Sequence, residues 1–206
     1  MMSHASERML LALFALLLVA IGAVLLGRAG SHDNSVHPAP FAGPALPTGL
    51  RAADFSLRDQ DGHSVSLSEQ HGRVVVLTFI HSRCKDACPL MVEQIKGALN
   101  DLPGSGSGVA AVGISVNPAE DTRSSRRAFL AQHGMIGRLA FVSGAPPVLR
   151  RVWRAYAMQP DQATALHSAF VLLIDKRGVE RVGFPADQLT PEGLAHDIAR
   201  LEREPV

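Results

Sequence analysis

The sequence predicts a three-layer α/β domain preceded by an N-terminal transmembrane anchor helix. Residues 9–27 form an uncharged apolar run, and residues 73–80 and 109–116 are nearly continuous apolar segments, typical of strands covered on both faces. Amphipathic segments alternate with these strands, as in α/β proteins. A chain of 206 residues has room for one domain and an appendage, and its net charge of +1 gives no reason to expect a nucleic-acid partner.

The anchor is predicted from the length of the apolar run. Arg8 and Arg28 bracket its 19 residues, which as a helix would span about 28 Å, close to the hydrocarbon thickness of a bilayer. A cleaved signal peptide is the alternative, but its core is usually about 7–15 residues long and is followed by small residues. We therefore expect a tail over 1–8 and an uncleaved anchor over 9–27. The short tail favours a domain exported to the periplasmic side of a bacterial inner membrane, or an equivalent oxidising compartment.

Residues 28–50 are rich in Pro, Gly and Ser without an apolar period, which predicts a tether between the anchor and a domain over 51–206. The domain opens with alternating segments at 55–57 and 65–67, on either side of Asp61-Gly62, which is typical of a β-hairpin.

Strands and helices alternate through the rest of the domain. Prolines suit the first turns of three of these helices, and Gly134 suits a helix C-terminus. The predicted elements are strand 73–80, a helix from Pro89 to about Leu102, strand 109–116, helix 122–133, strand 139–142, a helix from Pro146, a hairpin of strands 169–174 and 179–184, and a last helix from Pro191. This order is typical of a thioredoxin-like fold, which by itself does not give a function.

The only two cysteines, Cys84 and Cys88, lie between strand 73–80 and the helix at Pro89. A helix N-terminus stabilises thiolate, but thiolate serves as both a metal ligand and a nucleophile. Three residues separate the cysteines, one more than in the usual dithiol redox motif, although a disulfide stays possible. Two thiolates are soft donors that favour Cu(I). Metal binding and redox chemistry therefore both remain open.

A copper site with two thiolates calls for a third ligand, usually an imidazole. His167 is the best candidate because it precedes strand 169–174 in a loop at the end of the sheet, and His81 is the main alternative. The remaining histidines of the domain are expected to be solvated, in turns or on helix surfaces: His63, His71, His133 and His196.

Three segments together resemble the Sco/SenC family: 78–89 with both cysteines, Asn117–Thr122, and Leu166–Ser168. The family comprises membrane-anchored, thioredoxin-like copper carriers that assist assembly of the dinuclear copper site of cytochrome c oxidase. The resemblance implies a metallochaperone rather than an enzyme, with one copper ion per domain held by Cys84, Cys88 and His167. It implies a supporting role for Asp121 and, as partner, the copper-bearing oxidase subunit or another cuproprotein.

Four residues depart from the family pattern, and two of them, Arg83 and His81, are uncommon next to the first cysteine. Lys85 stands where many members have proline, and Asn117 where the family usually has aspartate, so both make the surroundings of the cysteines more positive. A thiol–disulfide oxidoreductase that keeps a partner's cysteines reduced is the alternative function, with Cys84 attacking and Cys88 resolving. An inert disulfide between the same residues is the remaining interpretation.

Overall fold

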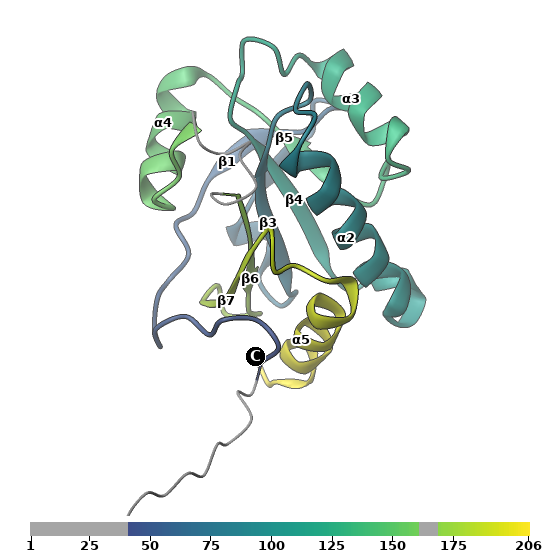
Figure 1. Ribbon diagram of the computed structural model, residues 1–206. Helices are drawn as coiled ribbons and strands as arrows, with labels where there is room; N and C mark the ends of the chain where they lie inside the picture. Colours follow the sequence, from purple (N-terminus) through teal and green to yellow (C-terminus); the bar gives the residue numbers. More distant parts are fainter. Residues whose placement is uncertain (1–40, 161–168) are drawn as a thin grey trace, which may run out of the picture. The chain divides into compact units, whose positions relative to one another are not determined.

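The computed structural model describes residues 41–160 and 169–206, and within them a five-stranded mixed sheet forms the middle layer (Figure 1). Its order is β5-β4-β3-β6-β7. The central strand β3 (Val75–Ile80) pairs in parallel with β4 (Ala110–Ser115), which pairs in parallel with β5 (Ala140–Val142). On the other side, β6 (Phe170–Ile174) and β7 (Glu180–Pro185) add antiparallel strands.

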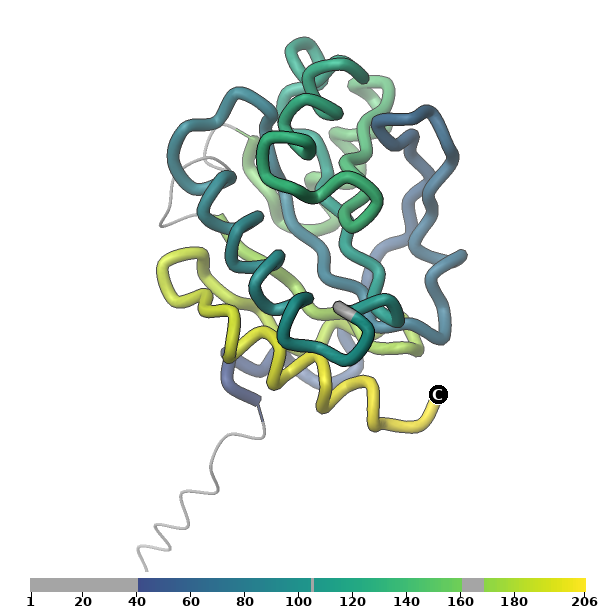
Figure 2. The backbone as a smooth tube through the Cα atoms, turned by 90° about the vertical axis from the view of Figure 1, so that its right-hand side faces the viewer, coloured from purple at the N-terminus to yellow at the C-terminus, as the bar shows by residue number. Residues whose placement is uncertain are grey.

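Helices and a small hairpin cover the two faces of this sheet. One face carries α2 (Ala87–Asp101), α3 (Arg123–Gln132) and α5 (Pro191–Arg203), which lie toward the viewer in Figure 2. The other face carries α4 (Pro146–Ala155) and the hairpin of β1 (Ser56–Arg58) and β2 (Ser64–Ser66). Short 3-10 turns span Ser68–Gln70 and Pro103–Gly106. The predicted three-layer α/β arrangement is therefore confirmed.

Most element boundaries follow from local sequence signals. Thr122 caps α3, its hydroxyl accepting a hydrogen bond from the backbone N–H of Ser125 at 3.2 Å, and Gly134 follows that helix with a positive φ of 66°. The main difference is at α2, which begins at Ala87, two residues before Pro89. Cys88 therefore belongs to the first turn of the helix rather than to the preceding loop.

Residues 41–50 correct the predicted extent of the tether, because they pack against the domain. The Phe41 ring is buried, and the guanidinium groups of Arg181 and Arg200 lie over it, 5.5 and 5.0 Å from its centroid. The buried Asp197 carboxylate accepts hydrogen bonds from the backbone N–H groups of Ala42 and Gly43, at 2.7 and 2.9 Å. The folded domain thus includes ten residues that composition assigns to a linker.

The predicted tail, the anchor over 9–27 and the first part of the tether lie outside the described residues. Among residues 41–160 and 169–206, no helix has the length and apolar character needed to cross a membrane. The anchor therefore stays a prediction.

Candidate metal centre

The two cysteines lie at the junction between β3 and α2, in what we call the cysteine loop (residues 81–86) and the helical turn after it. Cys84 is half-buried in the loop, whereas Cys88, the second residue of α2, is buried. The first N–H groups of a helix have no carbonyl partner within it. Here the backbone N–H of Cys88 donates to Sγ of Cys84 at 3.4 Å, while Asp86 at the N-cap offers no side-chain hydrogen bond. The Cys84 sulfur therefore takes the place of a capping oxygen.

The two thiols differ in acidity because they share one hydrogen bond. Donation from the Cys88 thiol, assisted by backbone N–H groups, lowers the pKa of Cys84 to about 6. The same hydrogen bond, together with burial and the negative charge on Cys84, raises the pKa of Cys88 above its ordinary value. At neutral pH the pair therefore holds one thiolate, on the more exposed Cys84, and one thiol on Cys88.

The buried carboxylate of Asp121 supports the cysteine loop through hydrogen bonds. Its Oδ1 accepts a hydrogen bond from the backbone N–H of Ser82 at 2.8 Å, and its Oδ2 accepts one from the Ser115 hydroxyl at 2.6 Å. The backbone carbonyl of Asp121 accepts from Nε of the buried Arg126 at 3.1 Å. These contacts join the loop to the end of β4 and the start of α3, as expected for the supporting residue that the family resemblance implies.

His81, the alternative third ligand, faces two carboxylates. Its Nδ1 lies 3.1 Å from Oδ1 of Asp121, and its Nε2 lies 3.0 Å from Oε2 of Glu120. Glu120 also lies 4.0 Å from the guanidinium of the exposed Arg83. In this arrangement His81 connects the cysteine loop to the 117–122 turn. The sequence predicts neither this role nor the contribution of Glu120.

Lys85 and Asn117, two of the departures from the family pattern, occupy different surroundings. Lys85 is exposed at the tip of the cysteine loop. Asn117 acts through its backbone, since its carbonyl accepts hydrogen bonds from the N–H groups of Glu120 and Asp121 at 3.1 and 2.9 Å. The turn that presents Asp121 is therefore closed without the aspartate that is usual at position 117.

His167, the predicted third ligand, lies outside the described residues. The strand that follows it is described: β6 begins beside the end of β3, with Val171 opposite Thr78, and the Thr78 hydroxyl donates to the carbonyl of Phe170 at 2.9 Å. The cysteine loop also leaves β3 at this end. The structure therefore places the start of β6 and the cysteine loop at the same edge of the sheet.

The other histidines are solvated as expected, with one exception. The His63 and His196 side chains are largely exposed, and His71 is exposed. The prediction was wrong for His133, which is buried. Its ring packs on Phe129 with centroids 4.6 Å apart, and its Nδ1 lies 3.0 Å from Oε1 of Glu93.

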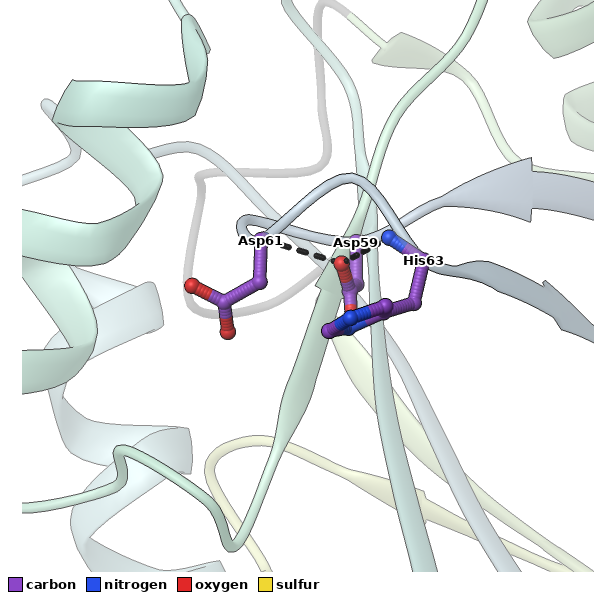
Figure 3. A group of neighbouring side chains, drawn as sticks. All are labelled: Asp59, Asp61 and His63. Carbon is purple, nitrogen blue, oxygen red and sulfur yellow. Dashed lines mark hydrogen bonds and ion pairs between the residues drawn. The ribbon is translucent and has the colours of Figure 1, made fainter.

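A second group of potential metal ligands lies in the β1–β2 turn, where Asp59, Asp61 and His63 come within 4.8 Å of one another (Figure 3). Oδ1 of Asp59 accepts hydrogen bonds from the backbone N–H groups of Asp61 and His63 at 2.9 and 2.8 Å. The Asp61 carboxylate accepts from Arg127 and, at 2.8 Å, from Gln60. The carboxylate oxygens of this group are thus already engaged in hydrogen bonds that stabilise the turn.

Comparison with known proteins identifies relatives of this arrangement. The SCO1/SenC family model matches residues 45–203. The structure of Bradyrhizobium japonicum ScoI with copper bound is 25% identical, with a TM-score of 0.63, and the match covers 74% of this chain and 99% of that chain. BsSco, a member of the Sco family of cytochrome c oxidase assembly proteins in which a disulfide switch is identified, is 20% identical. Its TM-score is 0.65, and the match covers 77% of this chain and 97% of BsSco.

A curated relative, the SCO1 protein homolog of Bacillus subtilis, is 28% identical over 87 residues, which are 42% of this chain and 45% of that protein. The chain spans less than half the length of each of the two curated relatives considered.

Proposed function

The chain belongs to the SCO1/SenC family, and from that premise we propose that it is a membrane-anchored metallochaperone. It binds one copper ion per domain and delivers it to the dinuclear copper site of cytochrome c oxidase, or helps that site to mature. The observation that carries the proposal is the sulfur pair at the β3–α2 junction, where the thiolate of Cys84 and the thiol of Cys88 lie within one helical turn. The copper-bound state of the 25% identical B. japonicum ScoI supports the same assignment.

The chemistry of the donors suits copper. Thiolates are soft ligands that select Cu(I), and a thiolate is available on Cys84 at neutral pH because its pKa is lowered. Copper binding would displace the remaining proton from Cys88, and the imidazole of His167 would complete the ligand set. The half-exposed Cys84 gives the ion a route in and out, whereas the Asp121 hydrogen bonds hold the loop in place.

Copper titration of the reduced full chain tests this proposal. We expect one copper ion per chain and a thiolate-to-metal absorption band for the Cu(II) form, both lost in Cys84→Ala and Cys88→Ala. His167→Ala should weaken copper binding by about tenfold or more, as expected for a lost ligand. The matched control is His63→Ala, which removes an exposed imidazole. Equal copper affinity in His167→Ala and the parent would overturn the three-ligand site.

The location of the domain is part of the same proposal. The apolar run over 9–27 anchors the chain, and the domain is exported to the periplasmic side of a bacterial inner membrane or an equivalent compartment. Alkaline extraction of membranes and protease digestion of intact spheroplasts test this topology. We expect the full chain to stay with the membrane and its domain to be digested from outside. Release by alkaline extraction would contradict the anchor.

A thiol–disulfide oxidoreductase is the second candidate, favoured by the contrast in acidity between the two thiols. The Cys84 thiolate would attack a partner's disulfide, forming a mixed disulfide and releasing one partner thiolate. Cys88 would then lose its proton and attack Sγ of Cys84, releasing the second partner sulfur. Two electrons pass to the partner, and Cys84 and Cys88 end as a disulfide.

Trapping distinguishes this candidate from copper delivery. In Cys88→Ala the mixed disulfide cannot resolve and should accumulate, whereas Cys84→Ala should form none. His167→Ala should retain the reductase activity, because an imidazole ligand has no part in these steps. Failure to trap an adduct with the oxidase subunit's copper-binding segment in its disulfide form would count against the redox function.

A further inference from the structure

The largely buried side chain of Glu180 lies at the start of β7, away from the cysteine loop. The register between β6 and β7 shifts by one residue, so that Leu173 pairs with Val182 but Ile174 pairs with Glu180. Residues paired across strands share a face of the sheet. The shift therefore turns Glu180 toward the face that carries Ile174 and α4, among apolar side chains.

Only 9% of the Glu180 surface is exposed, yet within residues 41–160 and 169–206 no hydrogen-bond donor or cation pairs with its carboxyl group. Burial alone raises its pKa. Two nearby arginines bind other carboxylates: Arg177 and Arg181 bind Asp175, and Arg181 also binds Glu204 at 2.6 Å. Its oxygens are not among the fully enclosed side-chain atoms that lack a partner, so they keep some contact with solvent in the adjoining cavities. A largely buried carboxyl group with a raised pKa in a cavity is a candidate binding group.

Glu180 lines an open cavity of about 370 Å³ whose other walls are mainly apolar. Leu46, Leu172, Phe170 and Pro185 contribute to these walls, together with the ring of Tyr156. The Tyr156 hydroxyl donates to the carbonyl of Ala53 at 2.7 Å, so that its proton is not available to Glu180. The cavity therefore combines apolar walls with one carboxyl group to which no residue in the described part of the chain donates a hydrogen bond.

We propose that this cavity binds an alkylammonium group, the chemistry shared by a lysine side chain of a partner protein and a free aliphatic amine. The ammonium group supplies the hydrogen-bond donors and the positive charge that Glu180 lacks. The methylene chain covers Leu46 and Leu172, as the stems of lysines cover apolar surface elsewhere. The Phe170 and Tyr156 side chains add aromatic surface to the walls. This function goes beyond copper binding and does not depend on it.

Binding of small amines to the isotope-labelled full chain, followed by NMR shifts of β6 and β7 amides, tests the proposal. The probes are Nα-acetyl-lysine N-methylamide, 1-aminopentane and, as the neutral analogue, Nα-acetyl-norleucine N-methylamide. We expect the ammonium probes to bind at least about tenfold more tightly than the norleucine probe, and Glu180→Gln to abolish this preference. Glu192→Gln, which changes an exposed carboxylate, should leave this preference intact.

Tighter binding of the blocked lysine than of the free amine identifies a protein partner as the source of the ammonium group, and the reverse identifies a small molecule.

Equal binding of the lysine and norleucine probes would overturn the proposal. So would a melting temperature of Glu180→Gln several degrees below that of the parent, because the carboxylate would then have a structural partner in solution. Arg51 lines a neighbouring cavity together with Glu180, so we also test whether its guanidinium group pairs with Glu180 in solution. Arg51→Gln should neither destabilise the fold nor weaken amine binding. Glu180→Gln should still bind one copper ion per chain, which would show that its loss of amine binding does not arise from damage to the metal centre.

Discussion

Two buried carboxyl groups in this domain have opposite surroundings. Asp121, 2% exposed, accepts hydrogen bonds from the Ser82 backbone and the Ser115 hydroxyl and lies beside His81. Glu180, 9% exposed, has no such partner within the described residues. Burial alone therefore does not tell what a carboxylate does. Asp121, with its hydrogen bonds filled by the protein, holds a loop in place, whereas Glu180, with no donor among the described residues, stays able to bind a ligand.

The largest effect that would test this comparison is expected at Asp121. Asp121→Asn keeps the shape of the side chain but replaces one acceptor oxygen with an NH₂ group, so either the Ser82 N–H or the Ser115 hydroxyl loses its acceptor. A buried donor that loses the carboxylate accepting its hydrogen bond lowers the unfolding free energy by about 3 kcal/mol. Urea denaturation of the full chain at pH 7 measures this loss.

Glu120→Gln is the matched control for that experiment. Glu120 is adjacent in sequence and also faces His81, but 43% of its side chain is exposed. We expect a loss of about 0.5 kcal/mol or less, as for exposed ion pairs. Similar losses in the two variants would mean that burial and saturation of Asp121 do not set its contribution.

The two thiols can be compared in the same way. Cys84 accepts hydrogen bonds, whereas Cys88 is buried and donates one to it. With a pKa of about 6 for Cys84, its thiolate fraction at pH 7 is about 90%, against about 3% for an ordinary cysteine. Alkylation of the reduced chain by iodoacetamide, followed by mass spectrometry, should show a half-maximal Cys84 rate near pH 6 and little modification of Cys88. Cys88→Ala should move the midpoint upward. A midpoint near 8.5 in the parent would contradict the shared hydrogen bond.

Much of the fold could be predicted from local sequence signals. Nearly continuous apolar runs indicate β3, β4 and β6, and Thr122 and Gly134 mark the ends of α3. Residues 41–50 could not be assigned in this way, because their composition is that of a linker. Their attachment depends on Asp197, a carboxylate more than 150 residues away in the sequence.

The candidate site shows the same division between local and long-range information. The cysteine pair is evident from the sequence, and the resemblance to a family singles out Asp121. The contacts of His81 and the burial of His133 depend on side chains from distant elements, Glu120 and Glu93 among them. Glu180 gives no sequence signal, since it follows a hairpin turn as an ordinary polar residue would, and only the register shift against Ile174 buries it.

The last prediction concerns Glu180, and its effect has the opposite sign to that at Asp121. Its pKa is raised in the folded chain, so protonation favours folding, and the parent loses stability as pH rises above about 4, the ordinary range for glutamate. Glu180→Gln carries no charge at any pH and escapes this loss. Urea denaturation should therefore give equal unfolding free energies near pH 4 and an advantage of about 1 kcal/mol for the variant at pH 8. A disadvantage at pH 8 would mean that the ionised carboxylate is stabilised in the free protein, as Asp121 is, and the contrast between the two carboxyl groups would fail.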